Sequence, residues 1–132
     1  MRYLVDSDWL IDAFIGMPAA VTLLAQLRSE GLAVSIISYG ELFEGALSAP
    51  DPAAELVRFR RFLDRLTLVP LDDSIMEIFA RARSDLRRYG NLIPDLDLLI
   101  AASALRHDLT LLTRNVRHFG RIPGLRLYQM RP

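Results

Sequence analysis

The sequence of 132 residues contains no cysteine and no lysine. The absence of cysteine excludes disulfide bonds, thiolate metal sites and cysteine nucleophiles. All sixteen basic residues are arginines, so any mechanism that needs a catalytic lysine is excluded as well. Sixteen acidic residues balance the arginines, and a net charge of zero provides no overall field that would attract nucleic acid or a membrane surface. A local basic patch that contacts RNA is still compatible with this composition.

Long apolar runs are missing too. No uncharged stretch reaches the roughly 18 apolar residues that a membrane span needs. Asp6 and Asp8 interrupt the first residues too early for the apolar region of a signal peptide. We therefore expect a cytoplasmic protein with no membrane partner. The length favours one domain over residues 1–132, with enough chain for a core.

Short apolar segments alternate with amphipathic segments along the chain. The expected strands are residues 3–5, 33–37, 66–71, 109–113 and 125–128. The expected helices cover residues 9–15, 18–30, 39–47, 53–66, 74–89 and 95–105. Strands that alternate with helices predict an α/β fold with three layers, in which helices cover both faces of a short, mostly parallel five-stranded sheet.

Two carboxylates stand at the beginning of the most apolar of these helices. Asp95 and Asp97 follow Pro94, and residues 98–105 leave almost no polar face. A helix this apolar belongs in the core, which would keep its first turn in a fixed place. The two acids either complement the helix dipole or take part in chemistry.

Further acids are predicted at one edge of the sheet. Asp6 ends the first strand, and Glu41 lies near the start of the helix after the second strand, where Ser38 and Glu41 also fit a capping box. Ligands of parallel sheets bind outside the carboxyl ends of the strands, so we expect Asp6, Glu41 and Asp97 to converge there. Converging carboxylates repel one another unless a cation joins them, and hard oxygen ligands suit Mg²⁺ or Mn²⁺. A water polarised by such a metal can attack a phosphodiester.

Four motifs follow one another in the order of a known family. They are Leu4–Asp8, Ser38–Gly45, Asp95–Ala102 and Leu111–Phe119, and together they extend over essentially the whole chain. In residue types and order the chain resembles PIN-domain ribonucleases, specifically the VapC-type toxins of type II toxin–antitoxin systems. The resemblance implies a single PIN-like domain and a metal-dependent endoribonuclease.

The resemblance also assigns roles and partners. It implies that Asp6, Glu41 and Asp97 are the catalytic acids and bind Mg²⁺ or Mn²⁺. It implies an RNA substrate, a homodimer and a VapB-type antitoxin whose helix and tail fill the active-site groove. The apolar stripe of Phe59 and Phe62 is compatible with a helical partner, although core packing explains it equally well.

The sequence departs from the family pattern near the end of the fourth strand. The family often has a further acid there, whereas this chain has Asn115 and His118. Asp95 is a candidate metal ligand in its place, provided that it lies just before the first turn of its helix, because residues two apart do not share a helix face. The weaker candidates for contacts to the substrate or to the ligands are Asp8, Thr113, Arg114 and Asn115. Their structural alternatives are a helix cap for Asp8, turn positions for Thr113 and Asn115, and surface charge for Arg114.

A different enzyme class shares part of the first motif. Asp6 and Asp8 also resemble the Asp-x-Asp start of haloacid-dehalogenase-type phosphatases, in which Asp6 would be the nucleophile. That family usually has Thr or Val where Leu10 stands, and commonly a later lysine. The missing lysine disfavours this alternative.

A function without catalysis is the second alternative. The incomplete set of acids is compatible with a PIN-like module that binds RNA or a protein partner but does not cleave. Metal binding without turnover would distinguish this module from the enzyme.

Overall fold

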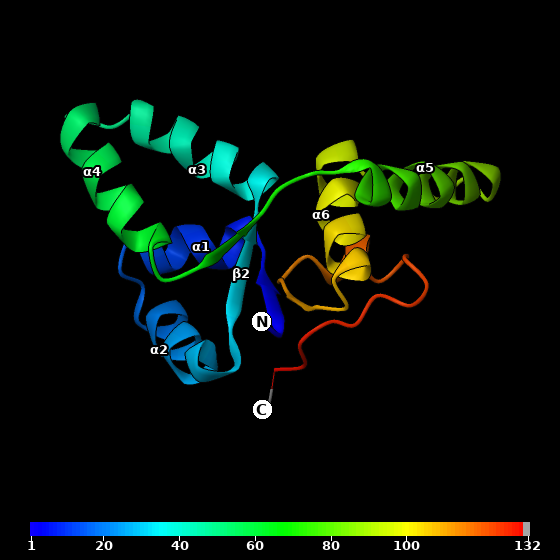
Figure 1. Ribbon diagram of the computed structural model, residues 1–132, viewed down its shortest axis with the longest axis horizontal. Helices are drawn as coiled ribbons and strands as arrows, with labels where there is room; N and C mark the ends of the chain where they lie inside the picture. Colours follow the sequence, from blue (N-terminus) through cyan, green and yellow to red (C-terminus); the bar gives the residue numbers. More distant parts are fainter. Residues whose placement is uncertain (131–132) are drawn as a thin grey trace.

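A parallel sheet separates two groups of helices in the computed structural model, which describes residues 1–130 (Figure 1). The strands are β1 (Tyr3–Val5), β2 (Leu32–Ser35), β3 (Thr67–Val69) and β4 (Thr110–Leu112). Their order is β3-β2-β1-β4, and all three pairs are parallel. The predicted α/β class is confirmed. The strand order changes direction at β1, which has β2 on one side and β4 on the other.

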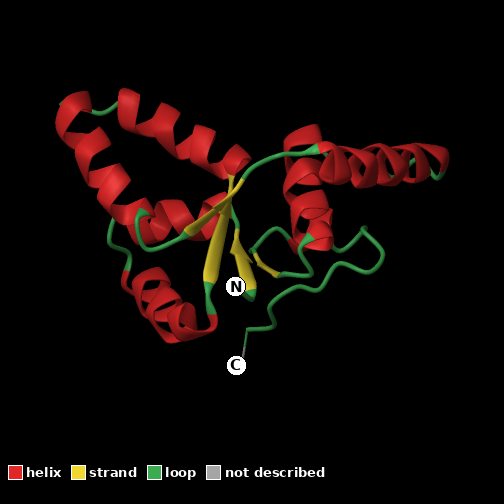
Figure 2. Cartoon of the chain, in the orientation of Figure 1, coloured by secondary structure: helices red, strands yellow, loops and turns green. Residues whose placement is uncertain are grey.

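The helices form the two outer layers. They are α1 (Ser7–Phe14), α2 (Pro18–Leu27) with the 3-10 turn η1 (Arg28–Glu30), α3 (Ile36–Leu47), α4 (Pro52–Leu63), α5 (Asp73–Arg88), α6 (Asp95–Arg106) and α7 (Val116–Phe119). Figure 2 shows α1 to α4 on one side of the sheet, and α5 with α6 on the other. No single helix in residues 1–130 has the length and apolar character to cross a membrane, although α1 together with the segment 18–30, bent by 112°, meets that test as a pair.

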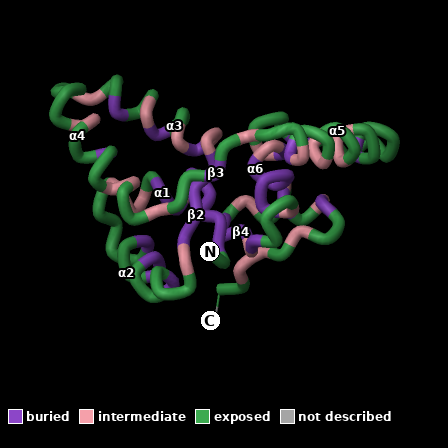
Figure 3. The backbone as a smooth tube through the Cα atoms, viewed as in Figure 1, coloured by how far each residue is buried: buried purple, intermediate pink, exposed green. Residues whose placement is uncertain are grey.

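Side chains of the strands alternate between two cores. Leu4 of β1 contributes to the core that contains α5 and α6, whereas Tyr3 and Val5 contribute to the core that contains α1 to α4. The period of two follows from the pleat of a strand. Figure 3 shows mostly buried residues along β1, β2 and β4 and within α6, and six of the twelve residues of α6 are buried. The prediction that this apolar helix lies in the core is confirmed.

The described sheet has four strands where the sequence predicts five. Residues 125–128 form only one isolated bridge within the described chain, between Leu111 and Leu127. β4 is itself three residues long, and the backbone hydrogen bonds between it and the segment involve Leu111: Leu111 N donates to Arg126 O, and Tyr128 N donates to Leu111 O. Apolar residues at 125 and 127 indicate burial against the core, which the structure confirms, but not a strand.

The boundary between β2 and α3 differs from the prediction. The strand ends at Ser35, whose Oγ accepts a hydrogen bond of 3.1 Å from Ile37 N and caps α3. Ser38 therefore lies inside the first turn, and the predicted capping box of Ser38 with Glu41 is wrong. The earlier start places Glu41 in the second turn of α3, with its side chain free for other contacts.

Candidate active site

Three of the predicted acids, Asp6, Glu41 and Asp97, lie at the carboxyl edge of the sheet beside β1. Asp6 directly follows β1, and Thr113 directly follows β4, the neighbouring strand. Asp97 lies in the first turn of α6, the helix that runs back toward the start of β4. The order of strands changes direction at β1, and such switch points are where parallel sheets form ligand sites.

Asp6 is the most buried of these acids, with 7% of its surface exposed. Its Oδ1 accepts a hydrogen bond of 2.8 Å from Ser7 N, which caps α1, and its Oδ2 accepts one of 2.6 Å from Thr113 Oγ1. Burial is the main cause that raises the pKa of Asp6 from 3.8 to about 6. The hydrogen bonds from Thr113 and Ser7 lower this pKa, whereas the charges of Asp8 and Asp97 raise it further. The like charges therefore act on one another at this edge.

Glu41 joins the same edge through two serines. Ser7 Oγ lies 2.8 Å from Ser38 Oγ and 2.9 Å from Glu41 Oε1. A hydroxyl carries one proton, so Ser7 donates it to Glu41 and accepts from Ser38. The sequence analysis missed both serines as site residues. They stand inside the motifs that match the family, but serine is common in turns and caps, so the pattern alone gave no signal.

Asp97 receives hydrogen bonds from the short helix α7 and its cap. Its Oδ2 lies 2.7 Å from His118 Nδ1 and 3.5 Å from Asn115 Nδ2. Asn115 also caps α7, which the sequence analysis did not predict, with its Oδ1 accepting from His118 N at 3.4 Å. The two residues that replace the family's further acid thus both contact Asp97.

Asp95 points to a different partner. It is the first residue of α6, whereas a place beside Asp97 required the position before the first turn. Its Oδ1 pairs with Arg83 Nε of α5 at 2.8 Å, and 59% of its side chain is exposed. The structure therefore does not bring Asp95 together with Asp97, and its role as a metal ligand stays a prediction without support from the geometry.

Asp8 and Arg114 connect the loop after β4 to α1. Asp8 Oδ1 accepts from Trp9 N, and its Oδ2 accepts from Arg114 N at 2.8 Å. Asp8 is in the first turn of α1, so the predicted cap at this residue is wrong and Asp6 is the cap. The Arg114 side chain donates to Asp12 Oδ2 at 2.7 Å and lies 3.9 Å from the centre of the Trp9 ring. These contacts fix the loop that carries Thr113 and Asn115.

The chemistry of these ligands fits a small, hard cation. Among residues 1–130, no three His, Asp or Glu side chains are gathered closely enough to enclose a metal by themselves. Mg²⁺ does not need such a cage, because it usually binds through one or two carboxylates and keeps several waters. Asp6 and Asp97 supply that pair, and a cation between like charges would relieve the repulsion that raises the Asp6 pKa.

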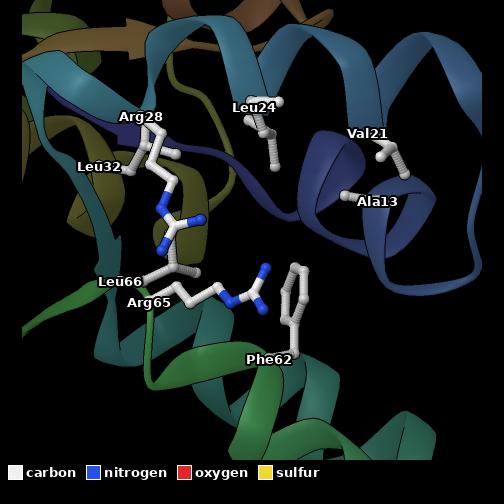
Figure 4. Close-up of a pocket in the computed structure, with 9 residues that line it drawn as sticks. Ala13, Val21, Leu24, Arg28, Leu32, Phe62, Arg65 and Leu66 are labelled. Atoms are coloured by element: carbon white, nitrogen blue, oxygen red, sulfur yellow. The ribbon is translucent and has the colours of Figure 1, made fainter.

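A second feature is an apolar pocket away from the acids, between α1, α2 and α4 (Figure 4). Its volume is about 270 Å³. The lining residues are Ala13, Val21, Leu24, Ala25, Arg28, Leu32, Phe62, Arg65 and Leu66. Figure 4 shows Arg28 and Arg65 extending into the pocket from opposite sides, with Arg65 beside the ring of Phe62. The pocket combines an apolar floor with two positive charges.

Comparisons with known proteins agree over nearly the whole chain. The family model of the PIN domain matches residues 3–125. Ribonuclease VapC19 of Mycobacterium tuberculosis is 35% identical over 122 residues, which cover 92% of this chain and 95% of that protein. The tRNA(fMet)-specific endonuclease VapC of Salmonella typhimurium is 27% identical over 127 residues, 96% of each chain. A crystal structure of VapBC2 from Rickettsia felis, bound to a DNA fragment from their promoter, matches with a TM-score of 0.88 and 27% identity over 97% of this chain and 98% of that chain.

Proposed function

Because this chain belongs to the PIN-domain family, as a VapC-type toxin, we propose that it is a metal-dependent endoribonuclease with its active site at Asp6, Glu41 and Asp97. The observation that carries this proposal is the buried Asp6 carboxylate, whose pKa is raised in part by the charge of Asp97 and whose neighbour Ser7 donates a hydrogen bond to Glu41. Membership of this family excludes the phosphatase alternative. The RNA substrate and the Mg²⁺ or Mn²⁺ ion are parts of the proposal.

The acids have distinct tasks in this scheme. Asp6 and Asp97 bind the cation, which when bound supplies a polarised water and stabilises charge on the phosphodiester. Ser7 and Thr113 keep the Asp6 carboxylate in one orientation through their hydrogen bonds. Glu41 Oε2, which has no hydrogen-bond partner among residues 1–130, is the oxygen that we assign to accept the proton of the attacking water.

Removal of the metal tests the proposal directly. We expect the purified protein to cleave structured RNA in Mg²⁺ or Mn²⁺, to stop when a chelator is added, and to recover when excess metal is restored. Gel analysis of labelled RNA fragments would follow the reaction. Cleavage that continues in chelator would contradict the metal-dependent mechanism. Mn²⁺ binding without cleavage of any RNA would instead support the module that binds without turnover.

The partner of the protein is a VapB-type antitoxin, and we assign the pocket between α1, α2 and α4 to one of its segments. The apolar floor suits the apolar face of a helix, and Arg28 with Arg65 suits acidic side chains beside that face. Phe62 of the predicted stripe contributes to this pocket, whereas Phe59 is fully buried in the core. A homodimer also stays a prediction, which the mass of the purified protein in solution would test.

We expect Arg65→Glu to weaken antitoxin binding about tenfold, because it replaces an attractive charge at the edge of the pocket with a repulsive one. The matched control is Arg60→Glu, which makes the same change on the exposed surface of α4 outside the pocket. Calorimetric titration of the cognate antitoxin into each variant would give the affinities. Equal affinities for both variants would show that the antitoxin does not use this pocket.

A further inference from the structure

The Asp97 carboxylate is bound on one side only. Both residues that contact it, His118 and Asn115, approach Oδ2, at 2.7 Å and 3.5 Å. Oδ1 has no hydrogen-bond partner among residues 1–130. Asp97 and His118 are both partly buried, with 25% and 30% of their side chains exposed. The arrangement leaves a single oxygen of Asp97 available to a ligand.

The chemistry of these groups determines which atom donates. A carboxylate oxygen only accepts, so the proton of the short contact stands on His118 Nδ1. The amide of Asn115 is oriented by its Oδ1, which accepts from His118 N and caps α7. Asn115 Nδ2 is therefore a donor, as His118 Nδ1 is, and the two nitrogens lie 2.9 Å apart. Asp97 Oδ2 is the acceptor that the two donors share.

The other acids are restricted in a similar way. Both oxygens of Asp6 already accept a hydrogen bond, and Glu41 Oε1 accepts from Ser7. Asp97 thus offers one oxygen that accepts no hydrogen bond, and an Asp6 oxygen can bind a metal only through the lone pair that its hydrogen bond leaves open. Binding through single oxygens suits six-coordinate Mg²⁺ or Mn²⁺ with retained waters and disfavours Ca²⁺, which often takes both oxygens of a carboxylate. A carboxylate at position 118 would add oxygen ligands for a second ion. A histidine whose Nδ1 donates a hydrogen bond to Asp97 presents no metal ligand on that side.

We propose that His118 is a positioning residue that binds Asp97 Oδ2 through Nδ1 and thereby limits the site to one divalent cation. This inference rests on the proposed function, because it assumes that Asp97 binds the metal. It predicts that the hydrogen bond acts by fixing the orientation of a ligand, as partners of metal ligands do elsewhere, where their loss lowers metal affinity about 10–100-fold.

The experiment is a calorimetric titration of Mn²⁺ into the wild type, His118→Ala, His118→Asn and His118→Gln. In His118→Asn the side-chain amide nitrogen takes the place of the imidazole Nδ1. In His118→Gln the amide nitrogen takes the place of the imidazole Nε2. We expect one Mn²⁺ per wild-type chain, a loss of about 10–100-fold in affinity for His118→Ala and His118→Gln, and affinity close to wild type for His118→Asn. Thermal unfolding of each variant in the absence of metal is the control for damage to the fold. Such damage would affect His118→Asn and His118→Gln alike.

A gain of binding provides an independent variant. His118→Asp adds a carboxylate beside Asp97, and we expect it to bind a second Mn²⁺ per chain. Two Mn²⁺ ions on the wild type, or unchanged affinity in His118→Ala, would overturn the inference. Retention in His118→Gln with loss in His118→Asn would also overturn it, because the contact would then run through Nε2.

RNA cleavage by the same preparations separates this inference from the proposed function. One Mn²⁺ per chain whose affinity depends on His118, in a protein that cleaves no RNA, would support the inference and contradict the proposed nuclease. Metal-dependent cleavage with the same Mn²⁺ affinity in the wild type and His118→Ala would overturn the inference alone. A wild type that binds no Mn²⁺ would overturn both.

Discussion

Replacement of Asp97 with asparagine is expected to lower kcat/KM for RNA cleavage roughly 10²–10³-fold, the range found when one charge-stabilising group is removed from an active site. The variant keeps the size of the side chain, and its Oδ1 can still accept from His118 Nδ1. It loses the negative charge that we assign to metal binding. Because Asp97 is in the first turn of α6 rather than in the core, the fold is expected to persist.

Asp95→Asn is a matched control, since it removes the same charge two residues earlier in the same turn. Asp95, whose side chain is 59% exposed, pairs with Arg83, and such surface ion pairs contribute only about 0–1 kcal/mol. We expect this variant to cleave RNA nearly as fast as the wild type. Initial rates at one Mg²⁺ concentration would compare them. If Asp95→Asn loses as much activity as Asp97→Asn, the sequence-based ligand set that includes Asp95 is right and the geometric argument against it is wrong.

The sequence predicted the gathering of acids because a parallel topology dictates it. Once Asp6 was placed at the end of a strand, the carboxyl edge of the sheet followed, and with it Asp97 at the start of the helix before the last strand. Ser7 was not recognised as a site residue, and the contact of His118 with Asp97 was not predicted, because both depend on hydrogen bonds between segments 34 and 21 residues apart. Local patterns report which face of an element is buried, but not which side chain from another element completes a contact.

Errors at the boundaries of elements have the same origin. Residues 33–37 are apolar enough for a longer strand, but Ser35 caps a helix there. The segment 125–128 has the alternation of a strand, and its leucines are packed against the core, but it pairs at one residue only. Composition predicts burial in both places. The hydrogen-bond partner of the backbone, which separates strand from helix or loop, lies elsewhere in the chain and cannot be identified from the pattern.

Asp6→Asn is expected to make the protein more stable at neutral pH while abolishing cleavage. In the folded protein, burial first and then the charges of Asp8 and Asp97 raise the Asp6 pKa to about 6, above its ordinary value of 3.8. A raised pKa means that the folded protein favours the protonated form of Asp6. The stabilisation from this preference is complete below pH 3.8 and is lost as the pH rises through 6 and the carboxyl ionises. At about 1.4 kcal/mol per pKa unit, the ionised group lowers the free energy of unfolding by about 3 kcal/mol at most. Asparagine stays neutral and can still cap α1.

The measurement is urea unfolding of the wild type and Asp6→Asn at a series of pH values from pH 4 to pH 7.5 in chelator. The difference in the free energy of unfolding between the two proteins is expected to be small at pH 4 and to grow as the pH rises through 6. It should level off above about pH 7, where Asp6 is ionised. Asp85→Asn, a change on the exposed surface of α5, is the control and is expected to show no such growth. An Asp6→Asn protein less stable than the wild type at pH 7.5 would show that the hydrogen bonds from Ser7 and Thr113 outweigh burial. If Asp6→Asn is the more stable protein at pH 7.5, Mn²⁺ should stabilise the wild type and not the variant. The buried charge that weakens the fold is then the one that binds the cation.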